Sequence, residues 1–455
     1  MLTFGTSGLR GLVAEFDRAS ITRWTMAFLR ACPPNGLLYV GRDLRPSSPR
    51  IADVIMQTAQ SAGIDTVDCG ALPTPALALA ACGASAIMVT GSHIPADRNG
   101  LKFYVPSGEI TKAEEAAIAA AYAGLPDHGA RSTIDGGAAY LGRYVQAFGE
   151  TALTGLRLGV YQHSSVARDI MTDLLTRLGA SVVPLARSDD FIPVDTEAVD
   201  AATRDMLAGW CADHELDGIV STDGDADRPM LTDANGKVIP GDILGIMTAQ
   251  SLNAGIVVTP VSSNSMVTEV FREVELTRIG SPYVIAGITN ILGSDPYARV
   301  VGFEANGGFL LGFDAQGPAG LLHALMTRDS LLPIIAPLAA TLTSGKTLAE
   351  RIATLPPRVT AADRLQQIDR AKAGAFLDRL SSSTEARKNF LEALGREEAI
   401  DHTDGLRLTL DKERVVHLRP SGNAPEFRVY VEAATGEQAS ALLERAMGMV
   451  RAEIG

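Results

Sequence analysis

The sequence has few cysteines and no close pair of them. Its 455 residues include four, Cys32, Cys69, Cys82 and Cys211, and no two are spaced as in a CxxC motif. A disulfide framework or a zinc knuckle is therefore not expected, and a reducing cytoplasm is the predicted location. The first residues also lack the basic and apolar regions of a signal peptide, so we expect none.

A long, strongly apolar run is also missing. Residues 69–96 carry no formal charge, but Pro73, Pro75 and Gly83 interrupt them, and alanine is commoner there than leucine. A helix that spans a membrane needs ~20 mostly strong apolar residues. This stretch instead predicts a short buried helix followed by a strand, in a soluble protein without a membrane partner.

The sequence also has no excess of basic residues. Acidic residues outnumber basic ones by 53 to 40, which gives a formal net charge of −13. Such a balance argues against nucleic acid and membrane surfaces as partners. It does not exclude small anions, because a few arginines can create a local positive site. The apolar fraction of 46% supports sizeable cores, and at ~150 residues per domain the chain has room for about three.

One unit recurs along most of the chain: a short apolar run, a polar loop and a helix-like segment. It is seen at 38–48, 85–100, 156–165, 216–229, 255–265 and 299–309. Val- and Ile-rich runs without alternation are typical of strands covered on both faces, so these units predict α/β domains. The last ~90 residues differ. A helix-like segment (366–380), a hairpin-like pair (404–420), a strand (427–433) and a closing helix indicate a separate α+β domain.

The loop Asp223-Gly224-Asp225-Ala226-Asp227-Arg228 directly follows an apolar run. Carboxylates at alternate positions of a turn can converge on one hard divalent cation. An EF-hand is excluded, because Arg228 stands where that loop needs glycine and Ala234 where it usually has glutamate. The alternative is a solvated acidic turn, which the adjacent Arg228, suited to a phosphate beside the metal, makes less attractive.

A second loop, Thr90-Gly91-Ser92-His93-Ile94-Pro95, ends another apolar run and is followed by Lys102. A serine there is placed to be a nucleophile or a phosphate carrier. The loop does not match the GxSxG elbow, and the adjacency of Ser92 and His93 does not establish a triad. Taken alone, the three side chains could equally be a capping serine, a surface histidine and a solvated lysine.

Two further loops are weaker signals. Arg419 to Pro425, with Arg428 shortly after, could cradle a phosphate dianion or form an ordinary turn between strands. Glu304 and Asn306 could bind sugar hydroxyls, although glycine-rich turns with one carboxylate are common. The segments around Arg10 and at 41–46 add positive charge beside flexible backbone, without a P-loop pattern.

Taken in order, these loops resemble one family. FGTSGLRG, GRDLRPSS, TGSHIPADRNGLKFY, DGDADRP, GFEANGGF and RPSGNAPEFRVYVEA are similar to the successive motifs of the α-D-phosphohexomutases, over residues 4 to about 433. The resemblance implies an α/β fold of four domains around a central cleft: three mixed-sheet α/β domains of related topology and a smaller C-terminal α+β domain. With the breaks in the sequence, we expect domains at 1–150, 151–253, 254–360 and 361–455. They would carry the phosphoserine, metal, sugar and phosphate loops respectively.

The resemblance also implies a role for each motif residue. Ser92 would carry the phosphoryl group, and one Mg²⁺ per chain would be held by Asp223, Asp225, Asp227 and the phosphate on Ser92. Arg10, His93, Lys102 and Arg228 would surround the reacting phosphoryl group, and Lys102 would assist proton transfer. Glu304 and Asn306 would bind the sugar hydroxyls. The non-reacting phosphate would be held by Arg419, Ser421, Gly422, Asn423 and Arg428.

The implied reaction interconverts hexose 6-phosphate and hexose 1-phosphate, with hexose 1,6-bisphosphate as intermediate and activator. Mannose is favoured, because GFEANGG and the phosphate loop look closer to phosphomannomutases than to phosphoglucosamine mutases. The alternatives are a dual-specificity or glucose-preferring phosphoglucomutase, a phosphoglucosamine mutase, a Mg²⁺-dependent phosphatase using Ser92 and a non-catalytic sugar-phosphate binding protein. The sequence departs from the family motifs at some positions. Gly91 replaces a family alanine, with little expected consequence. Gly308 replaces a histidine of some members, which leaves the acid–base group open. The oligomeric state is expected to be monomer or homodimer.

Overall fold

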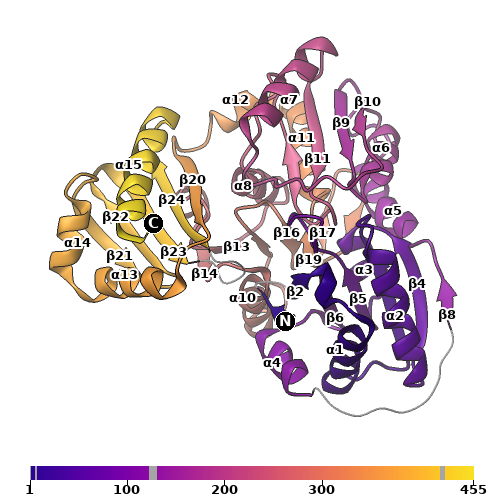
Figure 1. Cartoon of the computed structure of the whole chain (residues 1–455). Coiled ribbons are helices and arrows are strands. Elements are labelled where there is room, and N and C mark those ends of the chain that lie inside the picture. The colour runs from indigo at the N-terminus through magenta and orange to yellow at the C-terminus, as the bar shows by residue number, and fades with distance from the viewer. Residues whose placement is uncertain (1, 6–7, 122–130, 421–425, 455) are drawn as a thin grey trace.

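The structure is a computed structural model that describes residues 2–5, 8–121, 131–420 and 426–454 (Figure 1). It contains four main sheets, each with its own helices, which we call the first, second, third and C-terminal units. The C-terminal unit lies at one side of the molecule in Figure 1, beside the third unit. The predicted limits of the four domains stay a prediction.

The first unit has an eight-stranded mixed sheet. Its strands, in spatial order, are β1 (Thr3–Phe4), β2 (Leu9–Leu12), β6 (Arg98–Val105), β5 (Ser85–Val89), β3 (Leu37–Arg42), β4 (Asp65–Ala71) and β8 (Arg131–Thr133), with β7 (Gly108–Glu109) paired to β6. The helices are α1 (Arg18–Ala31), α2 (Ser48–Ser61), α3 (Thr74–Ala80), α4 (Lys112–Ala120) and α5 (Gly136–Phe148). The charge-free stretch thus forms the short helix α3 and the fully buried strand β5, as predicted.

The second and third units are smaller. The second has the strands β10 (Ser181–Arg187), β9 (Arg157–His163), β11 (Gly218–Thr222) and β12 (Pro229–Leu231), with helices α6 (Arg168–Arg177), α7 (Ala201–Asp213) and α8 (Gly241–Ser251). The third has β14 (Glu273–Thr277), β13 (Ile256–Pro260), β15 (Val300–Phe303), β16 (Phe309–Leu311) and β19 (Leu325–Asp329), and the separate hairpin of β17 (Ala315–Gln316) and β18 (Leu321–Leu322). Its helices are α9 (Val267–Val270), α10 (Ser281–Ser294), α11 (Leu332–Ser344) and α12 (Leu348–Ile352).

The same strand order recurs in these three sheets. Each contains three parallel strands with the second, first and third of the chain side by side, and the fourth antiparallel beside the third. The corresponding sets are β4-β3-β5-β6, β10-β9-β11-β12 and β14-β13-β15-β16. The expected related topology is therefore confirmed. It also means that the turn from the third to the fourth strand of each set occupies an equivalent place in the three α/β units.

Burial explains why the central strands form. Every residue of β5, β11 and β15 is buried, which confirms the expectation from their unalternating apolar runs. A single apolar cluster continues from α5 of the first unit through β9 and α8 to α11 of the third. The three α/β units therefore share a core. Among the residues described, no helix combines the length and apolar character needed to cross a membrane.

The C-terminal unit is built differently. Its five antiparallel strands lie in the order β20 (Val359–Gln366), β24 (Glu426–Ala433), β23 (Arg414–Pro420), β22 (Leu406–Leu410) and β21 (Glu397–Asp401). They are accompanied by α13 (Arg370–Ser382), α14 (Thr384–Leu391) and α15 (Gly436–Ile454). This unit has an apolar core of its own, which includes Phe376, Leu418, Phe427 and Val450. The predicted α+β class, hairpin and closing helix are confirmed.

Candidate active site

Ser92 lies in the turn between β5 and β6, where its side chain meets the second unit. Its Oγ donates a hydrogen bond to Asp223 Oδ2 at 2.8 Å, and its backbone N–H donates to Thr90 Oγ1 at 2.8 Å. The backbone of Ser92 has a φ of 55°, in the left-handed region that non-glycine residues rarely adopt. Ser92 is 2% exposed. The serine is therefore held in one place against the aspartate loop.

Arg45 bonds to the backbone of this serine loop. It is fully buried, and its guanidinium donates to the carbonyl oxygens of Ser92, Ile94, Pro95 and Arg98 at 2.8, 2.5, 2.7 and 2.8 Å. Asp43 balances its charge at 3.1 Å. A charged group that satisfies four carbonyls of one loop fixes that loop's shape.

Gly91 leaves room for this guanidinium. A Cβ at position 91 would lie 2.4 Å from Arg45 Cζ, closer than atoms can approach. On the other side of Arg45 the ring of Phe191, from the segment between β10 and α7, lies 4.2 Å from Cζ. Gly91 thus has a steric role that comparison with the family motif did not indicate.

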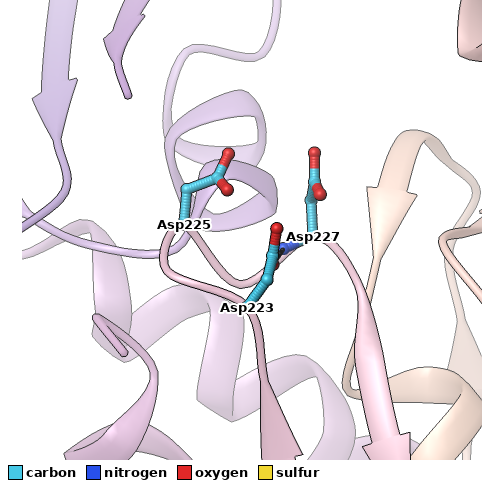
Figure 2. A group of neighbouring side chains, drawn as sticks. All are labelled: Asp223, Asp225 and Asp227. Carbon is cyan, nitrogen blue, oxygen red and sulfur yellow. Dashed lines mark hydrogen bonds between the residues drawn. The ribbon is translucent and has the colours of Figure 1, made fainter. Parts of the chain in front are cut away.

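Asp223, Asp225 and Asp227 converge in the equivalent turn of the second unit, between β11 and β12. All three are fully buried, and one oxygen from each lies within 4.8 Å of the others. Their carboxyl groups point to the same side of the loop (Figure 2). Asp225 Oδ1 and Asp227 Oδ1 are buried without a hydrogen-bond partner. Buried carboxylate oxygens left free in this way fit a hard divalent cation.

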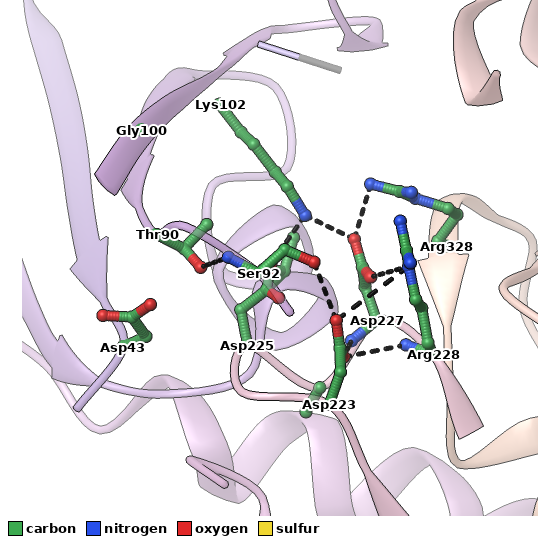
Figure 3. Close-up of polar contacts among 12 residues, drawn as sticks. Asp43, Thr90, Ser92, Gly100, Lys102, Asp223, Asp225, Asp227, Arg228 and Arg328 are labelled. Atoms are coloured by element: carbon green, nitrogen blue, oxygen red, sulfur yellow. Dashed lines mark hydrogen bonds and ion pairs between the residues drawn. The ribbon is translucent and has the colours of Figure 1, made fainter. Parts of the chain in front are cut away.

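Three cationic side chains surround the triad (Figure 3). The Lys102 ammonium, from β6 and fully buried, donates to Asp225 at 2.6 Å and contacts Asp227. The Arg328 guanidinium, from β19, lies 2.6 Å from Asp227 Oδ2. Arg228 Nε lies 4.0 Å from Asp223 and 3.9 Å from Asp227. The first, second and third units therefore all contribute to one charged cluster.

The surrounding charges shift the pKa values of Asp223 and Asp225 in opposite directions. Burial, together with the charges of Asp225 and Asp227, raises the pKa of Asp223 well above its usual range. Burial also acts to raise the pKa of Asp225, but the contact with Lys102 and the charges of Arg10 and Arg328 hold it below its usual range. Like charges forced together in a dry site are stabilised by cations, and a divalent ion would supply two more positive charges.

Arg10 and His93 complete the surroundings of Ser92. Arg10, on β2, donates from its guanidinium to the carbonyl of Thr90, and burial lowers its pKa to about 10. Nδ1 of His93 lies 3.4 Å from Ser92 Oγ. Burial and then the charge of Arg228 lower the pKa of His93 well below 6.5. Ser92 and the four residues predicted to surround its phosphoryl group, Arg10, His93, Lys102 and Arg228, thus lie near the aspartate triad.

Glu304 and Asn306 occupy the corresponding turn of the third unit, between β15 and β16. Glu304 is buried and accepts a hydrogen bond from Arg328 at 3.2 Å. The side-chain oxygen of Asn306 accepts the N–H of Gly308 at 3.0 Å, which leaves its amide N–H groups for a ligand. A Cβ at Gly308 would lie 2.9 Å from Arg328 Cδ. Arg328 therefore fills the space beside the position where some family members have histidine.

The predicted phosphate loop belongs to the C-terminal unit. Arg419, the residue before the end of β23, lies 3.0 Å from Asp404, and Arg428 is opposite it on β24. Burial acts to lower the pKa of Arg428, but Tyr430 and Glu197 raise it. The charge of Arg428 also lowers the pKa of His93, so the two units face a common space. Ser421, Gly422 and Asn423 lie outside the described residues.

Two groups of residues were missed by the sequence reasoning. Arg328 follows no recognisable motif, and its only signal was a basic residue at the end of an apolar run. Arg45 was noted merely as positive charge, although it organises the serine loop. Asp195 and Glu197, between β10 and α7, were not considered, yet Asp195 interacts with His93 and Glu197 with Arg428. Their positions depend on how separate units pack, which a single sequence does not reveal.

A serine loop, an aspartate triad and an arginine-bearing fourth unit, brought together in this order, define an enzyme of phosphoryl transfer. The chain belongs to the phosphoglucomutase/phosphomannomutase family. Residues 1–127, 139–236 and 240–359 match that family's alpha/beta/alpha domains I, II and III, and residues 358–448 match its C-terminal domain. The resemblance seen in the motifs is confirmed.

Curated relatives and solved structures agree with this assignment. The chain is 43% identical to a phosphomannomutase of Sinorhizobium fredii, over 99% of both chains. It is also 43% identical to a phosphomannomutase of Salmonella muenchen, over 100% of this chain and 96% of the relative. A phosphoglucomutase/phosphomannomutase family protein of Burkholderia thailandensis has the same fold, with a TM-score of 0.78 at 22% identity over 100% of this chain and 98% of that one.

Proposed function

We propose that this enzyme interconverts hexose 6-phosphate and hexose 1-phosphate, with mannose as the favoured sugar. The observation that carries the proposal is the contact between Ser92 and Asp223, which joins the serine loop of the first unit to the aspartate triad of the second. The two phosphomannomutases at 43% identity support mannose. Hexose 1,6-bisphosphate would be both intermediate and activator.

In the proposed mechanism, phosphorylated Ser92 gives its phosphoryl group to a hexose monophosphate. The bond between phosphorus and Ser92 Oγ breaks, and a bond to a hydroxyl oxygen of the sugar forms. The hydroxyl proton leaves that oxygen, and Lys102 Nζ assists proton transfer to Oγ. Arg10, His93 and Arg228 surround the transferring group, whose charge they would stabilise. The bisphosphate then turns, and its other phosphoryl group returns to Ser92.

Binding of the sugar is assigned to the other two units. Glu304 and Asn306 would bind hydroxyl groups, while Arg419, Arg428 and the loop residues Ser421, Gly422 and Asn423 would hold the phosphate that does not react. The same contacts must serve both orientations of the bisphosphate. A phosphate site on a separate unit suits that requirement, because it is independent of which phosphate reacts.

One Mg²⁺ per chain would be held by Asp223, Asp225, Asp227 and an oxygen on Ser92. When bound, it neutralises charge on the transferring phosphoryl group. Removal of divalent ions with EDTA should abolish activity and lower the melting temperature, and Mg²⁺ should restore both. The melting temperature of Asp225→Asn should no longer respond to Mg²⁺, whereas that of the exposed control Asp378→Asn should respond as the wild type does. An unchanged Mg²⁺ response in Asp225→Asn would contradict this metal site.

The reaction is tested by supplying mannose 1-phosphate, glucose 1-phosphate and glucosamine 1-phosphate in parallel, with Mg²⁺ and a hexose bisphosphate. We expect the 6-phosphate isomers, with mannose converted fastest. Release of inorganic phosphate without isomer formation would instead indicate the phosphatase. Ser92→Ala should lose both turnover and the phosphopeptide that contains residue 92. Retained activity in that variant would overturn the phosphoserine assignment. We also propose that the protein is cytoplasmic, which its free cysteines, three of them buried, support. The proposed oligomeric state is a monomer or a homodimer.

A further inference from the structure

The sheet of the C-terminal unit has one apolar and one polar face. On β24, Phe427, Val429 and Val431 point into the core of that unit and are fully buried. Arg428 and Tyr430 alternate with them and therefore lie on the opposite face. The polar face therefore carries Arg419 and Arg428 of the proposed phosphate site.

Three arginines stand side by side on that face. The register of the strands pairs Arg428 of β24 with Arg419 of β23 on one side and with Arg364 of β20 on the other. Side chains directly opposite each other in antiparallel strands lie on the same face, with their Cβ atoms about 5 Å apart. Like charges at such positions are destabilising unless an anion lies among them.

The carboxylates nearby balance this row only in part. Asp404 lies 3.0 Å from Arg419, but Glu426 lies 3.6 Å from Arg364 and 3.5 Å from Arg428. One carboxylate is thus shared between two guanidinium groups, at distances too long for strong bidentate pairing. Arg364 and Arg428 retain hydrogen-bonding capacity for a further anion.

Arg364 is also accessible, and its charge acts on a residue beside the serine loop. Its side chain is 38% exposed. Its charge, with those of His93 and Arg228, holds the pKa of Asp195 below its usual range against the effect of burial. Arg364 therefore lies near enough to the segment between β10 and α7 for its charge to act on Asp195. Glu197 of the same segment interacts with the charge of Arg428. Two arginines of the row thus act electrostatically on the segment whose Asp195 also interacts with His93.

We propose that Arg364 is a third arginine of the site that holds the non-reacting phosphate, beside Arg419 and Arg428. The inference rests on the proposed function and extends it to a residue outside every recognised motif. A phosphate dianion offers three oxygens, and a row of guanidinium groups can bond to more than one of them at once. Arg364 would therefore strengthen binding of hexose monophosphates and retention of the bisphosphate.

The test compares Arg364→Ala, Arg364→Lys and the wild type. Loss of one charge-assisted contact should raise KM for the hexose phosphate by about 10- to 100-fold while kcat changes little. The concentration of inorganic phosphate that half-inhibits turnover should rise by a similar factor in Arg364→Ala. Both values of Arg364→Lys should lie between those of the wild type and Arg364→Ala. The matched control is Arg396→Ala, since Arg396 is 79% exposed and pairs at 3.3 Å with Glu398 of the outer strand β21. That control should behave as the wild type does.

A purely structural role for Arg364 would give a different pattern. If Arg364 only neutralises Glu426, removing both charges in Arg364→Ala/Glu426→Gln should return KM to that of Glu426→Gln alone, and the inference would fail. We expect KM of the double variant to stay raised. Calorimetric titration with mannose 1-phosphate keeps the two proposals separate. A wild type that binds this ligand without isomerising it would contradict the proposed function, while equal affinities of wild type and Arg364→Ala would contradict this inference.

Discussion

Arg45 shows how much of an active site can depend on a residue that need not touch substrate. It is buried beneath the serine loop, bonds to four of its carbonyl oxygens and leaves no space for a side chain at position 91. Its neighbours Asp43 and Phe191 come from two different units. The position of Ser92 therefore depends on packing around one guanidinium group.

Gly91→Ala should destabilise the protein by about 1–3 kcal/mol, because the new Cβ must displace a buried guanidinium that bonds to the loop. Turnover should fall as well, since Ser92 would move with the loop. The measurement is urea unfolding together with the mutase assay. Gly142→Ala is the control: nothing lies within 4 Å of a Cβ there, and the site is inside a helix. This control should be neutral or gain up to ~1 kcal/mol. Wild-type stability in Gly91→Ala would contradict the steric role.

At the scale of elements, the equivalent turns of the three α/β units explain how the site assembles. Each turn follows the third parallel strand, and the turns carry Ser92, the aspartate triad and Glu304 with Asn306. The carboxyl ends of parallel strands are the usual place for ligand sites in α/β sheets. Repetition of one topology has therefore produced three loops with three different chemical tasks.

The segment between β10 and α7 connects two of these units through Phe191. Its ring lies over Arg45, and a Cβ at Gly224 would contact it at 3.3 Å. Phe191 is half-buried, so Phe191→Ala should reduce stability by about 1–3 kcal/mol, through lost apolar packing and the lost cation–π contact. Phe191→Leu should restore most of the packing but not the cation–π contact, a difference of about 1 kcal/mol. Urea unfolding of the wild type, Phe191→Ala and Phe191→Leu in parallel measures these stability differences. A Phe191→Ala variant as stable as the wild type would show that Phe191 does not stabilise the contact between the two units.

His417 of β23 makes the stability of the C-terminal unit depend on pH. Burial lowers its pKa to about 4, and the ring bonds to the backbone oxygen of Asp404 and stacks on Tyr430. The neighbouring charges are Arg407, Asp404 and Arg419. An unfolded histidine takes up its proton near pH 6.5 and the folded one only near pH 4, so folding is favoured by neutral imidazole. Stability should thus be full above about pH 6.5 and decline by on the order of 3 kcal/mol as the pH falls to about 4.

The check is the unfolding free energy of His417→Gln between pH 4 and pH 7.5. This variant should lose only the share of the decline that His417 contributes, because burial also lowers the pKa values of His163 and His93. The exposed His402→Gln should keep the whole decline. Identical pH profiles for wild type and His417→Gln would show that other groups cause the acid sensitivity.

For the whole molecule, the C-terminal unit is attached to the third unit mainly by polar contacts. Ser265 bonds to Glu432, the N–H of Ile279 donates to Asp404 at 2.9 Å, and Arg358 lies 2.6 Å from Glu269. The apolar core of the C-terminal unit contains only its own residues. Interfaces of this polar kind permit relative motion of the parts they join.

Asp404→Asn/Glu432→Gln should loosen this attachment without unfolding either part. We expect a larger radius of gyration in small-angle X-ray scattering, with an unchanged circular dichroism spectrum and a raised KM. Glu453→Gln is the control, because its partner Arg379 belongs to the same unit. A scattering curve identical to that of the wild type would mean that these carboxylates do not set the position of the C-terminal unit.

The sequence alone predicted the elements and the chemistry better than it predicted the arrangement. Unalternating apolar runs identified buried strands, and loop residue types identified Ser92, the aspartate triad and the arginines. The related topology of the three units was implied only by the family resemblance, because the irregular spacing between the units hides the equivalence of their turns. The sequence could not place Arg328 or Arg364, since their importance comes from strands far apart in the chain: Arg328 meets Asp227, and Arg364 stands opposite Arg428.

The left-handed backbone of Ser92 has an evolutionary consequence. Holding serine at a φ of 55° costs about 1–2 kcal/mol relative to a residue without a Cβ, so Ser92→Gly should yield a more stable but inactive protein. In a descendant no longer selected for activity, stability would therefore favour glycine at this position. Position 92 is thus one where the proposed reaction and the stability of the fold favour different residues.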